Sequence, residues 1–186
     1  MISLINFRKI FNKTVICILT VYAVLFICVY FFIAFSSYEV QKIDNQELIQ
    51  HVNWQDIFMH NISSAFTLIF LGLLSFGVVS TIFFLYDFYV ISYAAYSAYV
   101  HSGSFLYSFA ILMTHGFVEI IGIVLNFYLS TISFRYLINK LYKRNIFYVE
   151  DFKGIIQVMF LMLIIFLIAS LIEGFITPNL LKIIME

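Results

Sequence analysis

The sequence predicts an all-α membrane protein, a polytopic bundle of about five transmembrane helices. Of its 186 residues, 63% are hydrophobic and only 11% are charged, so the chain cannot cover a water-facing surface with polar side chains. No lysine or arginine occurs between Lys42 and Arg135, which leaves the middle of the chain apolar enough to enter a bilayer. We therefore expect residues 1–186 to form a single integral membrane domain.

The first predicted helix covers residues 14–35. Its 22 residues are enough to cross about 30 Å of hydrocarbon. The run ends at Ala34-Phe35-Ser36, which resembles a signal-peptidase site. Because the apolar region of a signal peptide is usually only about 7–15 residues long, we expect an uncleaved helix.

The next two predicted helices cover residues 62–86 and 88–102 and meet in a tight turn at Asp87. At this turn water or lipid headgroups would solvate the Asp87 carboxyl, and we expect it to cap a helix end. Gly72 and Gly77 fall inside the predicted helix 62–86, where small residues allow helices to approach closely.

The apolar region from residue 88 to residue 134 is too long for one helix. At 1.5 Å per residue, its 47 residues would reach about 70 Å, so the chain must turn back within it. Residues 102–104 and 114–116 contain the turn-forming glycines and are the two candidate breaks. The resulting helix covers residues 115–134, residues 104–114 either span or lie at the interface, and a last helix covers residues 154–175.

Charge gives the predicted orientation. The N-terminal segment carries Arg8, Lys9 and Lys13, and the segment 135–153 carries five more lysines and arginines. Short basic segments stay in the cytoplasm, whereas the acidic segment 36–60 belongs outside. Five helices satisfy all three segments, with the N-terminus cytoplasmic and the C-terminus outside. We therefore expect a multi-pass protein of the cell membrane.

Polar residues within the apolar runs form the candidate site. Glu119 and Glu173 have no adjacent lysine or arginine, although ionisable groups at membrane depth are costly. His115 precedes Glu119 by four residues and shares its helical face. His60 and Asn61 begin another helix at the same outer side. We expect these five residues to converge through the topology.

Several interpretations of this polar cluster stay open. It is a hydrogen-bonded lock between helices, or a polar seam that gates or binds a peptide or another membrane protein. A zinc site of His60, His115, Glu119 and Glu173 uses suitable ligand types, but no local motif supports it. General acid–base catalysis by Glu119 and Glu173 is another interpretation, but the sequence shows no arrangement that would activate a nucleophile. We assign no catalytic residue, metal or cofactor, and without a nucleotide-binding loop or basic patch we expect no nucleic acid partner.

Three segments resemble the stage II sporulation protein M family of small polytopic membrane proteins. Residues 58–61 and the following glycine-containing helix resemble the family's asparagine-led second helix. Residues 114–119 resemble its His-Gly-x-x-Glu motif, and residues 169–178 its final helix with an acidic residue and a Thr-Pro end. The resemblance covers residues 14–178 in the same order. It departs at residues 87–88, where an Asn-Gly turn is usual, and at Asn126 and Ser130, where more glycine is expected.

The resemblance implies a non-enzymatic role. The name-giving proteins look like scaffolds for cell-wall hydrolases during engulfment, while many relatives work beside ATP-binding cassette (ABC) transporters, including those for circular bacteriocins. The small size of this chain, with no added soluble domain, favours an accessory to ABC-type export, maturation or immunity for a peptide.

The alternatives are a hydrolase scaffold and an intramembrane metal-dependent peptide-processing enzyme. The partners expected are the lipid bilayer and other membrane proteins, among them an ABC transporter ATPase or cell-wall hydrolases. A peptide ligand and a second copy of the chain are further expected partners.

Overall fold

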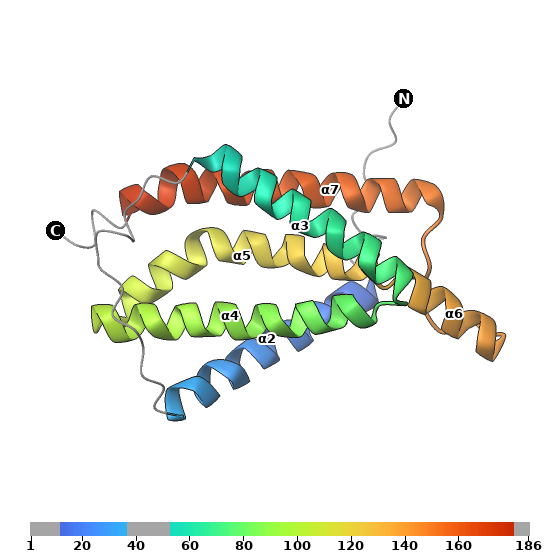
Figure 1. The fold of residues 1–186 in the computed structure, drawn as a ribbon, viewed down its shortest axis with the longest axis horizontal. Helices are drawn as coiled ribbons and strands as arrows, with labels where there is room; N and C mark the ends of the chain where they lie inside the picture. The colour runs from blue at the N-terminus through green and yellow to red at the C-terminus, as the bar shows by residue number, and fades with distance from the viewer. Residues whose placement is uncertain (1–11, 37–52, 181–186) are drawn as a thin grey trace.

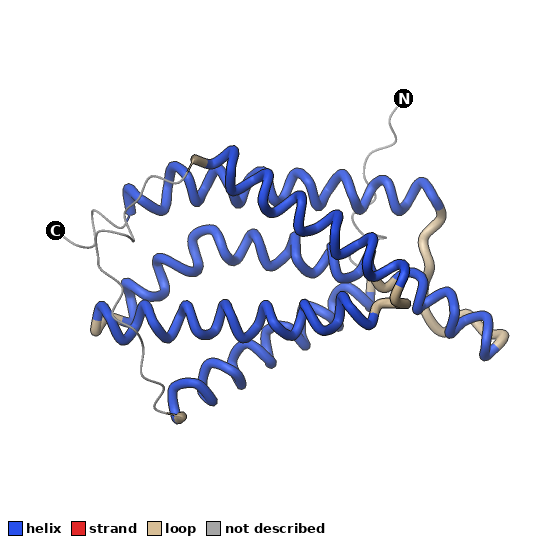
Figure 2. Tube along the Cα trace, in the orientation of Figure 1, coloured by secondary structure: helices blue, strands red, loops and turns tan. Residues whose placement is uncertain are grey.

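The computed structural model describes residues 12–36 and 53–180, except for the side chains of residues 101, 105–107, 109–113 and 115. In these segments the chain forms helices joined by short loops and contains no strand (Figure 2). The helices are α2 (Lys13–Phe35), α3 (Trp54–Leu74), α4 (Val78–Ser102), α5 (Phe105–Ser130), α6 (Ile132–Tyr142) and α7 (Phe152–Leu171), followed by the short π-helix η2 (Ile172–Ile176).

The long helices α2, α3, α4, α5 and α7 alternate in direction along one bundle (Figure 1). Four of them, α2, α3, α4 and α7, are long and apolar enough to cross a membrane. The bent pair Gly116–Ser130 and Ile132–Tyr142 provides a fifth candidate span. The predicted polytopic helical bundle is therefore confirmed.

Polar side chains fix where three of the helices begin. Asn12 caps α2 by accepting hydrogen bonds from the backbone N–H groups of Thr14 and Val15, at 2.9 and 3.2 Å. Asn53 caps α3 and Asp151 caps α7 in the same way. Each of these side chains satisfies N–H groups that have no partner within the helix. Because Asn53 supplies a cap, α3 begins at residue 54, eight residues before the predicted start.

The turn between α3 and α4 lies at residues 75–77, and the predicted turn at Asp87 is wrong. Gly77 has a φ of +82° and Phe76 a φ of +51°, the left-handed conformation that reverses the chain here. Glycine adopts this conformation without the steric cost that other residues meet. Asp87 is instead an interior residue of α4, so the predicted helices 62–86 and 88–102 are replaced by α3 and α4.

The next reversal lies at Gly103, one of the two predicted breaks, with a φ of +63°. Residues 105–114 form the first turns of α5 rather than a separate segment. At the other end of α5 the side chain of Thr131 bonds to the carbonyls of Phe127 and Tyr128. Such bonds back to the preceding turn often bend a helix. The chain bends by 43° here, and α6 projects from the bundle (Figure 1).

Helix α5 is the centre of the bundle and contacts α2, α3, α4, α6 and α7. The core around it is largely aromatic and aliphatic, and Phe84 of α4 stacks on Phe127 of α5 with ring centroids 4.1 Å apart. At the end near the 75–77 turn, α3 lies close to α4 and α5 because Gly72 has no side chain. A Cβ there would lie against Ser80 Oγ and 2.6 Å from the backbone oxygen of Ser130.

Candidate functional site

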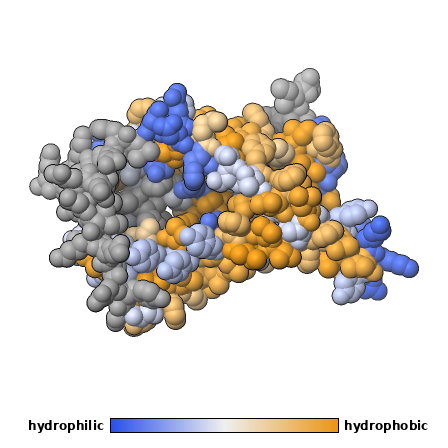
Figure 3. Space-filling view, viewed as in Figure 1, coloured by the Kyte–Doolittle hydropathy of each residue, from blue (hydrophilic) through white to orange (hydrophobic). Residues whose placement is uncertain are grey.

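A polar cleft of about 500 Å³ lies between α3, α4 and α5. Helices α3 and α4 meet at the 75–77 turn and separate toward the other end of the bundle, with α5 seen between them (Figure 1). Figure 3 shows hydrophilic residues over the first part of α3, on a face that is otherwise mostly hydrophobic. The ionisable and amide side chains that line the cleft are His60, Asn61, Tyr86, Asp87, Glu119 and Asn126.

Two carboxyl groups lie near the middle of the bundle's long axis. Asp87 is nine residues from the start of α4 and Glu119 eleven from the end of α5. These separations correspond to about 14 and 17 Å along the helices, roughly half of a 30 Å hydrocarbon layer. Both side chains are half-buried and line the same cleft. Among the described residues, neither carboxyl has a hydrogen bond or an ion pair.

The structure brings together three of the five residues predicted to form the polar cluster. His60, Asn61 and Glu119 all line the cleft, the first two from α3 and the third from α5. The side chain of His115 lies outside the described part of the chain. The role of this cluster, as a lock or as a docking seam, stays a prediction.

Glu173, the fifth predicted residue, lies beside the cleft and not in its lining. It belongs to η2, which packs against the first turn of α3: a Cβ at Gly174 would lie 2.7 Å from Cβ of Trp54. The π-helical turn therefore brings a third acidic residue to the α3 side of the bundle.

Of the four predicted zinc ligands, the structure describes the side chains of His60, Glu119 and Glu173, and a site that includes His115 stays a prediction. No group of three or more His, Cys, Asp or Glu side chains that could hold a metal ion occurs among those residues. His60 and Glu119 share the cleft, but Glu173 lies outside its lining.

Two buried polar groups near the cleft were missed by sequence reasoning. Asn126 lines the cleft, is 5% exposed and has a side-chain oxygen with no hydrogen-bond partner among the described residues. Tyr22 of α2 is 2% exposed, and its hydroxyl is likewise unpartnered. The Tyr22 ring packs edge-on against Phe84, a residue of the cleft lining, with ring centroids 5.5 Å apart. Buried polar groups normally have partners, so these two mark the region as unusual.

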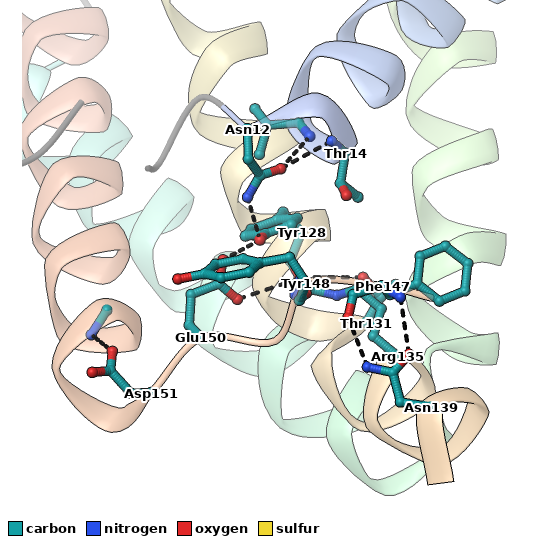
Figure 4. Close-up of polar contacts among 12 residues, drawn as sticks. Asn12, Thr14, Tyr128, Thr131, Arg135, Asn139, Phe147, Tyr148, Glu150 and Asp151 are labelled. Atoms are coloured by element: carbon teal, nitrogen blue, oxygen red, sulfur yellow. Dashed lines mark hydrogen bonds and ion pairs between the residues drawn. The ribbon is translucent and has the colours of Figure 1, made fainter. Parts of the chain in front are cut away.

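A second polar centre occupies the opposite, basic end of the bundle (Figure 4). Arg135 forms an ion pair with Glu150 at 3.3 Å, and their side chains are only 3% and 4% exposed. The guanidinium donates to the backbone oxygens of Tyr128 and Tyr148 at 2.6 and 2.8 Å and lies 3.8 Å from the centre of the Tyr128 ring. The Tyr128 hydroxyl donates to Glu150 and accepts from Asn12.

This second centre joins four separate parts of the chain: the start of α2, the end of α5, helix α6 and the loop before α7. The sequence presents Arg135 and Glu150 as loop charges that set orientation, and we missed their pairing. One sequence feature could have indicated that Glu150 is buried: it closely follows the aromatic residues Phe147 and Tyr148. Local sequence does not show which of the neighbouring basic residues reaches it. The ion pair is structural and leaves the cleft as the candidate functional site.

Comparison with known families identifies the chain. The model of the SpoIIM family, described as stage II sporulation protein M, matches residues 15–178, which is most of the sequence. The chain belongs to the SpoIIM family. No curated protein and no solved structure matches it. Together with its long apolar helices, the family membership makes it a multi-pass membrane protein.

The two departures from the SpoIIM pattern have structural explanations in this family member. The first concerns the turn after the second spanning helix, which lies at Phe76 and Gly77 and not at Asp87. The glycine of the expected turn is therefore present, and phenylalanine stands in place of the asparagine. The second concerns Asn126 and Ser130, which stand where more glycine is expected. Asn126 lines the cleft, and Ser130 is fully buried against Gly72.

Proposed function

We propose that this SpoIIM-family chain is a non-enzymatic membrane subunit of a cell-envelope complex, accessory to ABC-type export, maturation or immunity for a peptide such as a circular bacteriocin. The observation that carries the proposal is the cleft, whose Asp87 and Glu119 carboxyls have no hydrogen bond or ion pair among the described residues. Polar groups at membrane depth normally pair with other protein groups. A partner that covers the cleft would supply such groups.

The depth of the cleft favours a membrane-embedded partner. A scaffold for water-soluble cell-wall hydrolases would present its docking groups at the outer end of the bundle. The Asp87 and Glu119 carboxyls lie about 14–17 Å from the basic end, a distance of roughly half the thickness of a 30 Å hydrocarbon layer. Ser63, Ser64 and Thr67 line the cleft from α3 and are exposed, so the cleft opens sideways toward lipid and neighbouring helices. This access supports a transporter or immunity partner.

The proposal is tested by photocrosslinking in the native membrane. A photoreactive amino acid replaces Thr67 at the cleft, and a control replaces Phe160, an exposed residue of α7 that does not line the cleft. We expect crosslinks from position 67, and not from position 160, to a transporter subunit or a membrane peptide identified by mass spectrometry.

Other results would overturn this proposal. A protein that purifies alone as a monomer, with no adduct from position 67, contradicts a role as a subunit. A cell-wall hydrolase in the adduct supports the scaffold alternative. Stoichiometric zinc in the purified protein supports the metal-dependent enzyme.

A further inference from the structure

We infer that the cleft between α3, α4 and α5 binds a basic side chain, lysine or arginine, carried into the membrane by a peptide or helix of the partner. The inference rests on the proposed function and names the chemistry by which the partner is recognised. Four properties of the cleft favour such an occupant: its charge, its unpartnered acceptor, its size and the direction from which it opens.

The cleft is lined by the carboxyl groups of Asp87 and Glu119, and His60 is the basic side chain in its lining. Residues 54–134, which include α3, α4 and α5, contain no lysine or arginine. Arg135, which follows them, is already paired with Glu150 at the basic end. Ionised carboxyls in a membrane are stabilised by a nearby cation, so the cleft favours a cationic occupant.

Asn126 provides a second, independent observation. Its side chain is 95% buried, lines the cleft and has an oxygen without a hydrogen-bond partner among the described residues. A buried acceptor without a donor destabilises the fold, because the oxygen has lost its hydrogen bonds to water and gained none in return. Lysine and arginine carry only donors on their charged groups, three and five respectively, and match a cleft of carboxyl and amide oxygens.

The size and the apolar walls of the cleft suit an organic cation better than a metal ion. Its volume of about 500 Å³ far exceeds the roughly 30 Å³ that one water molecule occupies in the liquid. Phe83, Phe84, Phe127 and Phe166 contribute to its lining. Aromatic faces attract ammonium and guanidinium groups, and apolar walls cover the methylene stem of a basic side chain. Arg135 is held in a similar way at the other end of this protein, by the Tyr128 ring and the Glu150 carboxyl.

The position of the cleft requires an occupant that is itself in the membrane. The two carboxyl groups lie about 14–17 Å from the basic ends of their helices. Thr67 on α3 and Tyr86 on α4 are exposed residues of the lining, so access is from the side of the bundle. A basic residue within a membrane-inserted segment reaches this depth while its backbone remains in lipid, where a helix satisfies its own hydrogen bonds.

The test uses the full chain in vesicles of the neutral lipid phosphatidylcholine. The probe is a synthetic transmembrane helix of leucine and alanine with one central lysine, and the control peptide has norleucine in its place. Binding is measured by energy transfer between labelled peptide and labelled protein. We expect the lysine peptide to bind at least about tenfold more tightly, the size of one charge-assisted hydrogen bond.

Variants locate the binding site. In Asp87→Asn/Glu119→Gln we expect the lysine preference to fall to about twofold or less. Asp56→Asn is the matched control, because Asp56 is an exposed acidic residue of α3 outside the cleft lining, and it should keep the preference. Thr67→Trp narrows the opening and leaves both carboxyls in place, so it should lower lysine-peptide binding even if the double variant does not fold.

Equal binding of the two peptides to the wild-type chain overturns the inference, as does a preference that survives in Asp87→Asn/Glu119→Gln or lysine-peptide binding that is unchanged in Thr67→Trp. If the preference is absent while crosslinking at position 67 still captures an envelope partner, only the inference fails. If the preference is present and no partner is captured, the proposed subunit role fails instead.

Discussion

Arg135 illustrates at the residue scale how the same side chain can serve topology and stability. In the sequence it is the first of five lysines and arginines in a segment whose positive charge predicts a cytoplasmic location. In the structure it is buried, paired with Glu150 and placed over the ring of Tyr128. Removing one partner of a buried ion pair is more damaging than removing an exposed charge, because the other partner stays buried and unpaired.

Glu150→Gln should therefore lower the free energy of unfolding by about 3–5 kcal/mol. The matched control is Asp151→Asn, at the adjacent and exposed carboxylate, because asparagine also caps a helix and can still accept from Gly154 N–H. Thermal unfolding in detergent measures both. Equal stability of the two variants would show that the Arg135–Glu150 pair contributes nothing.

At the scale of the helices, the packing of the bundle depends on the close approach of α3 to α4 and α5. Gly72 of α3 faces Ser80 of α4 and Ser130 of α5, and its backbone oxygen accepts a hydrogen bond from Ser133 at 3.4 Å. Small residues allow such contacts between helices in a membrane. The close contact holds α3 and α4 together at the turn, while farther along the two helices separate and the cleft opens between them.

Gly72→Ala should destabilise the protein by about 1–3 kcal/mol, since a new Cβ would meet the Ser130 backbone oxygen at 2.6 Å and force the helices apart. Gly116→Ala is the control: it is also an interior helix position, but no atom lies within 4 Å of the added Cβ. That variant should be neutral or more stable by up to about 1 kcal/mol, from helix propensity. Melting temperatures in the same detergent compare them, and a similar loss in both would contradict close packing at Gly72.

At the scale of the whole molecule, the alternating helices gather the described lysines and arginines at one end. Lys13 begins α2, and Arg135, Lys140 and Lys153 lie in α6 and at the start of α7, which Figure 1 shows at the same end. Trp54 and Glu173 lie at the other end. Five crossings are therefore compatible with both basic segments on one side of the membrane, and the predicted side is the cytoplasm.

Cysteine labelling tests this orientation. In a background without Cys17 and Cys28, Gln55→Cys places a thiol at the predicted outer end and Asn145→Cys places one in the basic loop; both positions are exposed. An impermeant maleimide should label position 55 in intact cells and position 145 only after the membrane is opened. Labelling in the reverse order would invert the topology.

The sequence by itself determined the helical membrane class, the apolar spans and the segments that identify the family. These properties depend on runs of about twenty residues and on local motifs, so they can be evaluated without knowing how the helices pack. The sequence also contained the turn at Gly77, which we interpreted as a packing position.

Only the tertiary structure decided which polar residues meet. Asp87 joins Glu119 and Asn126 in one cleft, Glu173 stays beside it, and Arg135 pairs with Glu150. The partners in each case lie on different helices or loops, and their contact depends on how each helix is rotated about its axis and where its neighbours cross. Hydropathy does not specify those rotations, because leucine and phenylalanine are equally stable facing lipid or another helix.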